Sequence, residues 1–302
     1  MIMEVVRITP RGYCHGVVEA IRIAKRVGNE ETGEPVAMLG YLVHNEHVTG
    51  ELEASGVRLV DRNNRIEGLS QIDSGTVIFT AHGVSPAVVQ AARDRGLRVV
   101  DATCSDVTRT HDLIRRLVGD GYHVVYVGKR GHPEPEGAVG VAPGDVTLIE
   151  TEADVPGLDF PQEARLAVTC QTTLSMWDTQ RVIDSLIDRY PQTEVHNEIC
   201  RATQERQEAA VLAADDVDCV VVVGSLRSSN SRRLVQVVEE MACKPAHLVD
   251  TAADLRPEWF DGVRKVGVTS GASTPTQLTR AVIAALEAMP GVLIRSDNPI
   301  GG

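Results

Sequence analysis

The sequence predicts an α/β protein built from three similar units. Three stretches of the 302-residue chain share one order of features: a β-branched strand, a polar turn, and a cysteine that opens a helix. The cysteines are Cys14, Cys104 and Cys200, at nearly equal intervals along the chain. Strands that alternate with helices favour parallel sheets with right-handed crossovers. In such sheets, ligands bind beyond the carboxyl ends of the strands.

The first unit is expected to span residues 1–103, including the N-terminal strand and Cys14. After Cys14, apolar side chains recur at the spacing of one helical face and stop near Gly28. A second helix is predicted over 86–95, because a proline opens it and a glycine follows it. The strands of this unit are expected at 5–8, 36–39, 57–60 and 77–80, with a last one that ends at 99–100.

The second unit is expected at 104–199 and the third at 200–281, and both repeat the scheme. Residues 282–302 then hold the remainder of the last helix and a short tail. Helices are predicted at 177–190 and 277–288 from their apolar periodicity. Short apolar runs predict strands at 124–127, 166–169, 219–223 and 266–269.

Composition narrows the class of partner. The net charge of −12 argues against nucleic acid and against an anionic membrane, and 3% aromatic residues provide few base-stacking platforms. No apolar run is long enough for a membrane span, and the N-terminal residues lack the regions of a signal peptide. Six cysteines in a chain of this length do not form a disulfide scaffold. We therefore expect a cytoplasmic protein.

The three recurring cysteines predict a metal centre. The N-terminus of a helix favours negative charge, so a cysteine there is biased toward thiolate, the form that ligates metal. Three converging thiolates suit an iron–sulfur cluster with one iron that has no protein ligand. The alternative is three ordinary buried cysteines, which the shared context of Cys14, Cys104 and Cys200 disfavours. Cys219 and Cys243 lack this context and are expected to be structural.

Polar loops follow the strands of all three units. They carry neutral hydrogen-bonding side chains, which predict an anion site built with few lysines or arginines, although one such loop alone could be merely solvated. In the stretch 131–137, His132 and Glu134 stand two apart in a turn bounded by glycine and proline, and both could move a proton. An acidic surface turn is the alternative there. The common nucleotide-binding and C-x-x-C signatures are absent.

A series of short motifs runs from residue 10 to residue 275, nearly the whole chain. The motifs are P-R-G-Y-C, L-V-H-N, T-A-H-G-V-S, D-A-T-C, G-H-P-E-x-E-G, Q-T-T-L-S, E-I-C-x-A-T-x-x-R-Q-E-A, S-S-N-S-x-R-L and G-A-S-T-P. They are weak singly and highly specific in this order. Taken together, they resemble the 4-hydroxy-3-methylbut-2-enyl diphosphate reductase family, also called LytB/IspH.

The resemblance implies a trefoil of three α/β units with parallel sheets around a central [4Fe–4S] cluster. The cluster ligands would be Cys14, Cys104 and Cys200. Glu134 would supply protons, and Thr172 would orient the allylic hydroxyl of the substrate. The remaining substrate-binding residues would be His44, His82, His132, Ser228, Ser229, Asn230 and Ser273.

The resemblance also implies a reaction and its partners. The family removes the hydroxyl group of the allylic diphosphate with two electrons from ferredoxin or flavodoxin, which yields isopentenyl and dimethylallyl diphosphates in the last step of the methylerythritol phosphate pathway. The chain departs from the family pattern at His15, Ser105 and Cys170, and it has a short C-terminus. Two alternatives stay open: a non-enzymatic iron–sulfur sensor, and another three-cysteine enzyme of the quinolinate synthase type.

Overall fold

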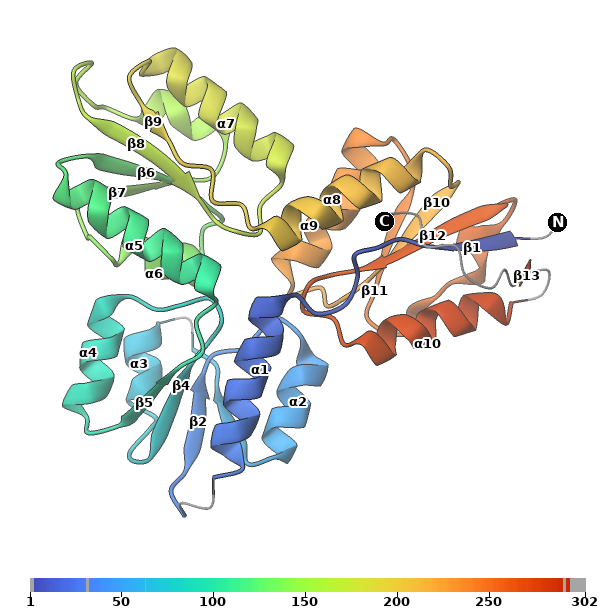
Figure 1. Cartoon of the computed structure of the whole chain (residues 1–302), viewed down its shortest axis with the longest axis horizontal. Coiled ribbons are helices and arrows are strands. Elements are labelled where there is room, and N and C mark those ends of the chain that lie inside the picture. The colour runs from blue at the N-terminus through green and yellow to red at the C-terminus, as the bar shows by residue number, and fades with distance from the viewer. Residues whose placement is uncertain (1–2, 31–32, 63, 290–291, 294–302) are drawn as a thin grey trace. The chain divides into compact units, whose positions relative to one another are not determined.

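The chain folds into α/β layers, and the computed structural model describes residues 3–30, 33–62, 64–289 and 292–293. It divides into two compact units. Unit 1 comprises Met1–Cys14, His44–His47 and Arg201–Gly302, and unit 2 comprises His15–Val43 and Val48–Cys200. Within the described residues, unit 1 holds one sheet and unit 2 holds two, and every strand pair is parallel (Figure 1). The predicted fold class, with three parallel-sheet units, is confirmed.

The sheet of unit 1 has helices on both faces. Strand β10 (Cys219–Val223) is buried along its whole length, as expected for a parallel strand covered on both sides. Its side chains alternate between the faces: Val220 and Val222 pack with helices α8 and α9, whereas Val221 and Val223 pack with helix α10.

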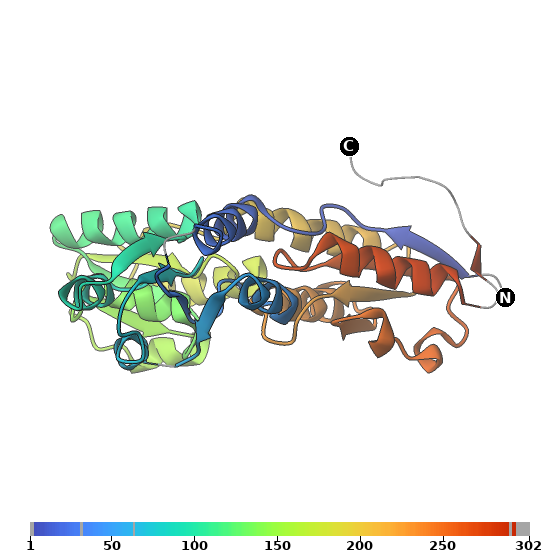
Figure 2. The same ribbon diagram turned by 90° about the horizontal axis from the view of Figure 1, so that it is seen from below.

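The elements of this sheet follow the order β11-β10-β12-β1-β13. Helix α10 lies beside β1 in both ribbon views (Figures 1 and 2). The bounds are β1 (Met3–Arg7), α8 (Arg201–Ala214), α9 (Ser229–Met241), β11 (Ala246–Val249), η2 (Ala252–Asp254), η3 (Pro257–Phe260), β12 (Lys265–Ser270), α10 (Thr276–Glu287) and β13 (Val292–Leu293).

The first sheet of unit 2 has the order β3-β2-β4-β5. Helices α3 and α4 pack on one face of this sheet, and α1 and α2 lie on the other side (Figure 1). The elements are α1 (His15–Gly28), β2 (Val36–Leu39), α2 (Glu46–Ala54), β3 (Val57–Val60), α3 (Arg65–Leu69), β4 (Thr76–Phe79), α4 (Pro86–Asp94) and β5 (Arg98–Asp101).

The second sheet of unit 2 has the order β7-β6-β8-β9. Helix α7 packs on one face, and α5 and α6 pack on the other. The elements are α5 (Ser105–Gly119), β6 (His123–Val127), α6 (Pro133–Val139), β7 (Val146–Ile149), η1 (Glu152–Gly157), β8 (Leu166–Cys170), α7 (Met176–Arg189) and β9 (Glu194–Val195).

Strand β1 corrects the predicted organisation. The sequence predicted this strand in the first of three units, at 1–103. In the structure it pairs with β12 and β13, in the sheet of unit 1 that also holds the strands predicted for the third unit. A glycine in β12 makes room for this arrangement, because a Cβ atom at Gly267 would come within 2.9 Å of Ile8 Cδ1. A short buried strand carries little local information about its partner, so packing between distant residues decides the pairing.

The helices agree with the sequence where apolar periodicity was clear. Those predicted at 86–95, 177–190 and 277–288 are α4, α7 and α10, each within one residue at either end. The stretch 131–137, expected to be a turn, instead begins a short helix, α6, with proline at its first position. No helix in the described part of the chain is both long and apolar enough to span a bilayer.

Truncation of Leu234 should destabilise unit 1 strongly. This side chain of α9 is fully buried against α8 and β10, so Leu234→Ala should lower the free energy of unfolding by about 2–5 kcal/mol. Leu212, on α8 of the same unit, is 69% exposed, and Leu212→Ala should cost less than about 0.5 kcal/mol. Denaturant unfolding measures both variants. Equal losses would contradict the packing described for α9.

Candidate functional site

A buried carboxyl group lies at the end of strand β6. Glu134 is 2% exposed and belongs to α6. The backbone N–H of Thr172 donates a hydrogen bond to its Oε1 atom at 2.7 Å, and the Thr172 hydroxyl donates to Oε2 at 3.1 Å. The two residues meet because β6 and β8 are parallel neighbours, so the loops after them leave the same edge of the sheet.

This environment prepares Glu134 to exchange a proton near neutral pH. Burial raises the pKa of its carboxyl group to about 7, because the charged form loses its hydration. The two hydrogen bonds from Thr172 oppose this shift, and the negative charge of Asp106 adds to it. A carboxyl group whose pKa lies close to the working pH can both hold and release a proton, as a general acid must.

Two imidazoles accompany this carboxyl group. His132 caps the start of α6, where its Nδ1 atom accepts a hydrogen bond from the Glu134 backbone N–H at 3.2 Å. In a neutral ring the proton is then on Nε2, which can donate. The ring of His82, from the loop after β4, meets that of His132 edge-on at a centroid distance of 5.3 Å. His82, His132, Glu134 and Thr172 therefore lie together in unit 2.

Two of the predicted cluster ligands belong to the same unit. Cys104 directly precedes α5, and its N–H donates to the carbonyl of Ala81, the neighbour of His82. Cys200 ends unit 2, and its N–H donates to the carbonyl of Thr172 at 3.0 Å. Both thiols are half-buried and neither is disulfide-bonded. The backbone thus connects Cys104 to the loop that carries His82 and Cys200 to the loop that carries Thr172.

The start of α1 packs directly against Cys104. A Cβ atom at Gly16 would lie 2.4 Å from Cys104 Sγ, so the absence of a side chain there makes space for the sulfur atom. His15, Cys104 and Asp106 present their ligand atoms within 4.8 Å of one another. Half-buried thiols at helix starts fit the soft ligands that iron–sulfur clusters require.

Cys170 lies in a different environment. It is fully buried at the end of β8, where its Sγ atom lies 3.5 Å from Asn197 Oδ1. Burial raises the pKa of this thiol to about 12. Cys170 therefore stays protonated, and a protonated thiol is a poor metal ligand.

The other predicted binding residues belong to unit 1. Ser228 caps α9 through a hydrogen bond from the N–H of Ser231 at 3.1 Å, and Ser229 is the first residue of that helix. Asn230 Oδ1 accepts from the N–H of Ala272 at 2.9 Å, which ties α9 to the loop after β12. The Ser273 hydroxyl, in that loop, donates to the His44 carbonyl at 3.5 Å.

Cys14 is fixed to the same loop of unit 1. Its N–H donates to the carbonyl of Ala272 at 3.0 Å. Arg206 lies within the motif E-I-C-x-A-T-x-x-R-Q-E-A, but no role was predicted for it from the sequence; it is 4% exposed and donates to the Gly12 carbonyl at 2.8 Å. No local pattern reports this contact, because Arg206 and Gly12 lie far apart in the sequence. We assign Arg206 a positioning role for the segment that carries Cys14.

Comparison with known proteins identifies the family. Residues 5–287 match the family described as LytB protein. The chain belongs to this family. A 4-hydroxy-3-methylbut-2-enyl diphosphate reductase of Symbiobacterium thermophilum is 59% identical over 286 residues, which cover 94% of this chain and 97% of the relative. The reductase of Bacillus licheniformis is 53% identical, with 94% and 91% covered.

Solved structures of LytB proteins agree with this fold. The reductase of Plasmodium falciparum aligns with a TM-score of 0.91 at 30% identity, covering 100% of this chain and 96% of that one. A second structure, described as the terminal enzyme of the non-mevalonate pathway, aligns with a TM-score of 0.66 at 30% identity, covering 95% and 100%.

In this LytB family member, the predicted site residues divide between the two units. Unit 2 holds Cys104, Cys200, His82, His132, Glu134 and Thr172, and unit 1 holds Cys14, His44, Ser228, Ser229, Asn230 and Ser273. The chain passes from one unit to the other directly after Cys14, directly before His44 and directly after Cys200. Three of the predicted residues thus border these crossings.

Proposed function

We propose that this chain reduces 4-hydroxy-3-methylbut-2-enyl diphosphate to isopentenyl and dimethylallyl diphosphates. The relatives that cover nearly the whole chain carry the name of this reductase, which makes the chain an iron–sulfur oxidoreductase of isoprenoid synthesis. The reaction consumes two electrons and two protons, and it releases the hydroxyl oxygen as water. The electrons would come from ferredoxin or flavodoxin.

One observation carries the mechanism: the buried carboxyl group of Glu134, bound to Thr172. Loss of the allylic hydroxyl requires a proton on the departing oxygen, and Glu134 can hold that proton near neutral pH. Since Thr172 also accepts a hydrogen bond from the Cys200 N–H, the proton source is tied to a proposed cluster ligand through one residue.

Cys14, Cys104 and Cys200 would hold a [4Fe–4S] cluster. When bound, this cluster supplies the electrons of the reduction and an iron that has no protein ligand. The shared position of the three thiols before helices supports the assignment, because helix N-termini stabilise thiolates. The high pKa of Cys170 supports its exclusion.

The diphosphate would be bound mainly by the polar loops of unit 1. Ser228, Ser229, Asn230 and Ser273 surround the start of α9 and the loop after β12, and the backbone of His44 joins them through Ser273. Hydroxyl, amide and imidazole groups can replace the hydration of a diphosphate by charge-assisted hydrogen bonds. The start of α9 adds the favourable end of a helix dipole.

Thr172 and Glu134 of unit 2 would act on the other end of the substrate. The Thr172 hydroxyl, now donating to Glu134, would orient the allylic hydroxyl group. Glu134 Oε2 would then pass its proton to the departing oxygen. His82 would join the residues that hold the diphosphate, and His132 would reach the substrate too.

Serine substitutions test the cluster ligands. Cys14→Ser, Cys104→Ser and Cys200→Ser should each abolish or strongly reduce the iron–sulfur absorption of anaerobically purified protein, because a hydroxyl group is a poor ligand for this metal. Cys170→Ser is the matched control and should keep the absorption. Retention of a normal spectrum in any of the first three, or its loss in the control alone, would refute the assignment.

Replacement of Glu134 tests the proton donor. Glu134→Gln keeps the shape of the side chain but cannot supply a proton, so turnover should fall by roughly 10²–10⁴-fold with the cluster spectrum unchanged. Glu136→Gln is the control and should keep near-normal turnover, because Glu136 stands two positions further along α6 and is exposed. Product formation from the allylic diphosphate with a reduced electron donor measures both variants. Near-normal turnover in Glu134→Gln would leave His132 as the next candidate.

A further inference from the structure

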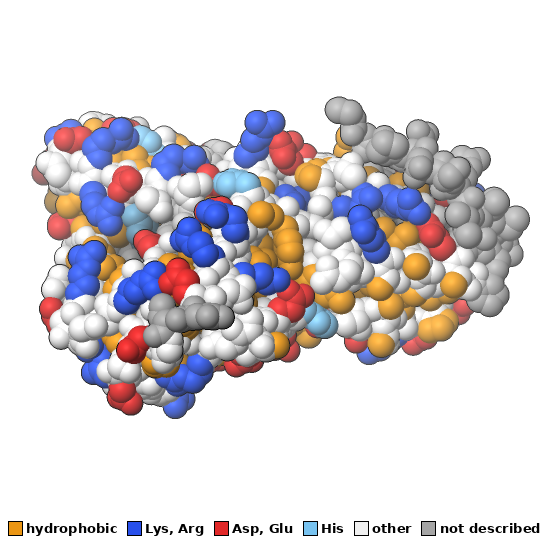
Figure 3. Space-filling model, turned by 60° about the horizontal axis from the view of Figure 1, so that its bottom comes forward, with side chains coloured by type: hydrophobic (Ala, Val, Ile, Leu, Met, Phe, Trp, Pro, Cys, Tyr) orange, Lys and Arg blue, Asp and Glu red, His pale blue; other side chains and the backbone are white. Residues whose placement is uncertain are grey.

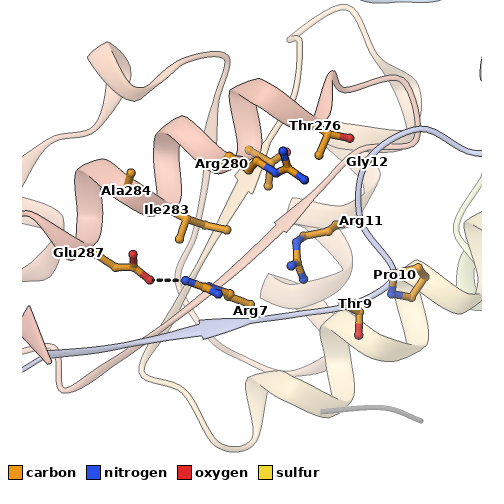
Figure 4. A pocket seen from close by; sticks show the side chains of 11 residues that line it. Arg7, Thr9, Pro10, Arg11, Gly12, Thr276, Arg280, Ile283, Ala284 and Glu287 are labelled. Carbon is orange, nitrogen blue, oxygen red and sulfur yellow. Dashed lines mark hydrogen bonds and ion pairs between the residues drawn. The ribbon is translucent and has the colours of Figure 1, made fainter. Parts of the chain in front are cut away.

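Unit 1 contains a cavity that the proposed function does not use. It has a volume of about 600 Å³ and opens between the segment that follows β1 and helix α10 (Figure 4). Pro10, Arg11 and Gly12 form one wall, and Thr276, Arg280 and Ile283 stand on the helix opposite. On the face of the molecule that α10 forms, Lys and Arg side chains gather in one patch (Figure 3).

The lining is positively charged although the chain as a whole carries −12. Arg7, Arg11 and Arg280 line the cavity together with one carboxylate, Glu287. Arg7 pairs with Glu287 at 2.9 Å, and Figure 4 shows this contact at one end of the cavity. Among the described residues, no carboxylate lies within ion-pair distance of Arg11 or Arg280, so the lining keeps an excess of positive charge.

The guanidinium group of Arg11 is repelled by those of Arg7 and Arg280. Burial lowers the pKa of Arg11, and the positive charges of Arg7 and Arg280 lower it further. Such repulsion costs free energy when the cavity holds only water. An anion between the guanidinium groups would relieve it and would form charge-assisted hydrogen bonds with their planar donor sets.

The apolar part of the wall and the volume describe what the cavity would accept. Ile283, Ala284 and Pro10 add an apolar part to the wall. The volume is typical of sites for small organic molecules.

We propose that this cavity binds a small organic phosphate or diphosphate, whose oxygens contact Arg11 and Arg280 while a short apolar group lies against Ile283. The site is separate from the diphosphate loops proposed above and does not depend on them. It also borders the segment that leads to Cys14: Gly12 donates to the Ser270 hydroxyl at 2.7 Å and accepts from Arg206. A bound anion would therefore stabilise this segment.

Calorimetric titration of anaerobically purified protein tests the proposal. The protein carries Asn230→Ala and Ser273→Ala to disable the diphosphate loops, and the probes are isopentenyl diphosphate and inorganic pyrophosphate. We expect one equivalent of either probe to bind, with isopentenyl diphosphate several-fold tighter because of its apolar group. Adding Arg11→Gln and Arg280→Gln should weaken binding by about 10–100-fold, since hydrogen bonds to charged groups are lost.

Arg264→Gln is the matched control. It removes one positive charge from an exposed position of unit 1 outside the cavity, and binding should stay unchanged. Absence of binding in the Asn230→Ala, Ser273→Ala protein would overturn the proposal, because both probes would then use the diphosphate loops only. Equal affinity in the control and in the protein lacking Arg11 and Arg280 would overturn it as well.

Discussion

The pair of hydrogen bonds from Thr172 to Glu134 is the interaction on which the rest of the site in unit 2 depends. Burial raises the pKa of the Glu134 carboxyl group and these two bonds lower it, so they limit how tightly the proton is held. The carbonyl group of Thr172 also accepts a hydrogen bond from the Cys200 N–H. Thr172 thus tunes the acid and positions a proposed ligand through different atoms.

Parallel sheets explain why such contacts arise between residues far apart in sequence. Strands β6 and β8 end at one edge, so the loops that carry Glu134 and Thr172 emerge side by side. In unit 1, β10 and β12 are likewise neighbours, and Asn230 reaches the backbone of Ala272 across their ends. The same constraint therefore builds both groups of polar residues, each within its own unit.

The sequence predicted features with a local cause and missed those with a distant one. Cysteines at helix starts, proline and glycine at the ends of α4, and apolar periodicity in α7 are local, and the structure agrees with them. The pairing of β1 with β12 joins residues from opposite ends of the chain, which no local pattern reports. Burial of Glu134 and the support of Gly12 by Arg206 are likewise tertiary effects.

The pH dependence of turnover tests the central claim, that Glu134 delivers a proton from a buried carboxyl group. The pKa of the Glu134 carboxyl group is about 7. At saturating substrate, turnover of the wild type should be highest at pH values below this pKa, where the carboxyl group is protonated. Above that pKa turnover should fall by about tenfold per pH unit, because the fraction of protonated acid falls in proportion. A rate that stays constant from well below to well above neutral pH would contradict the account.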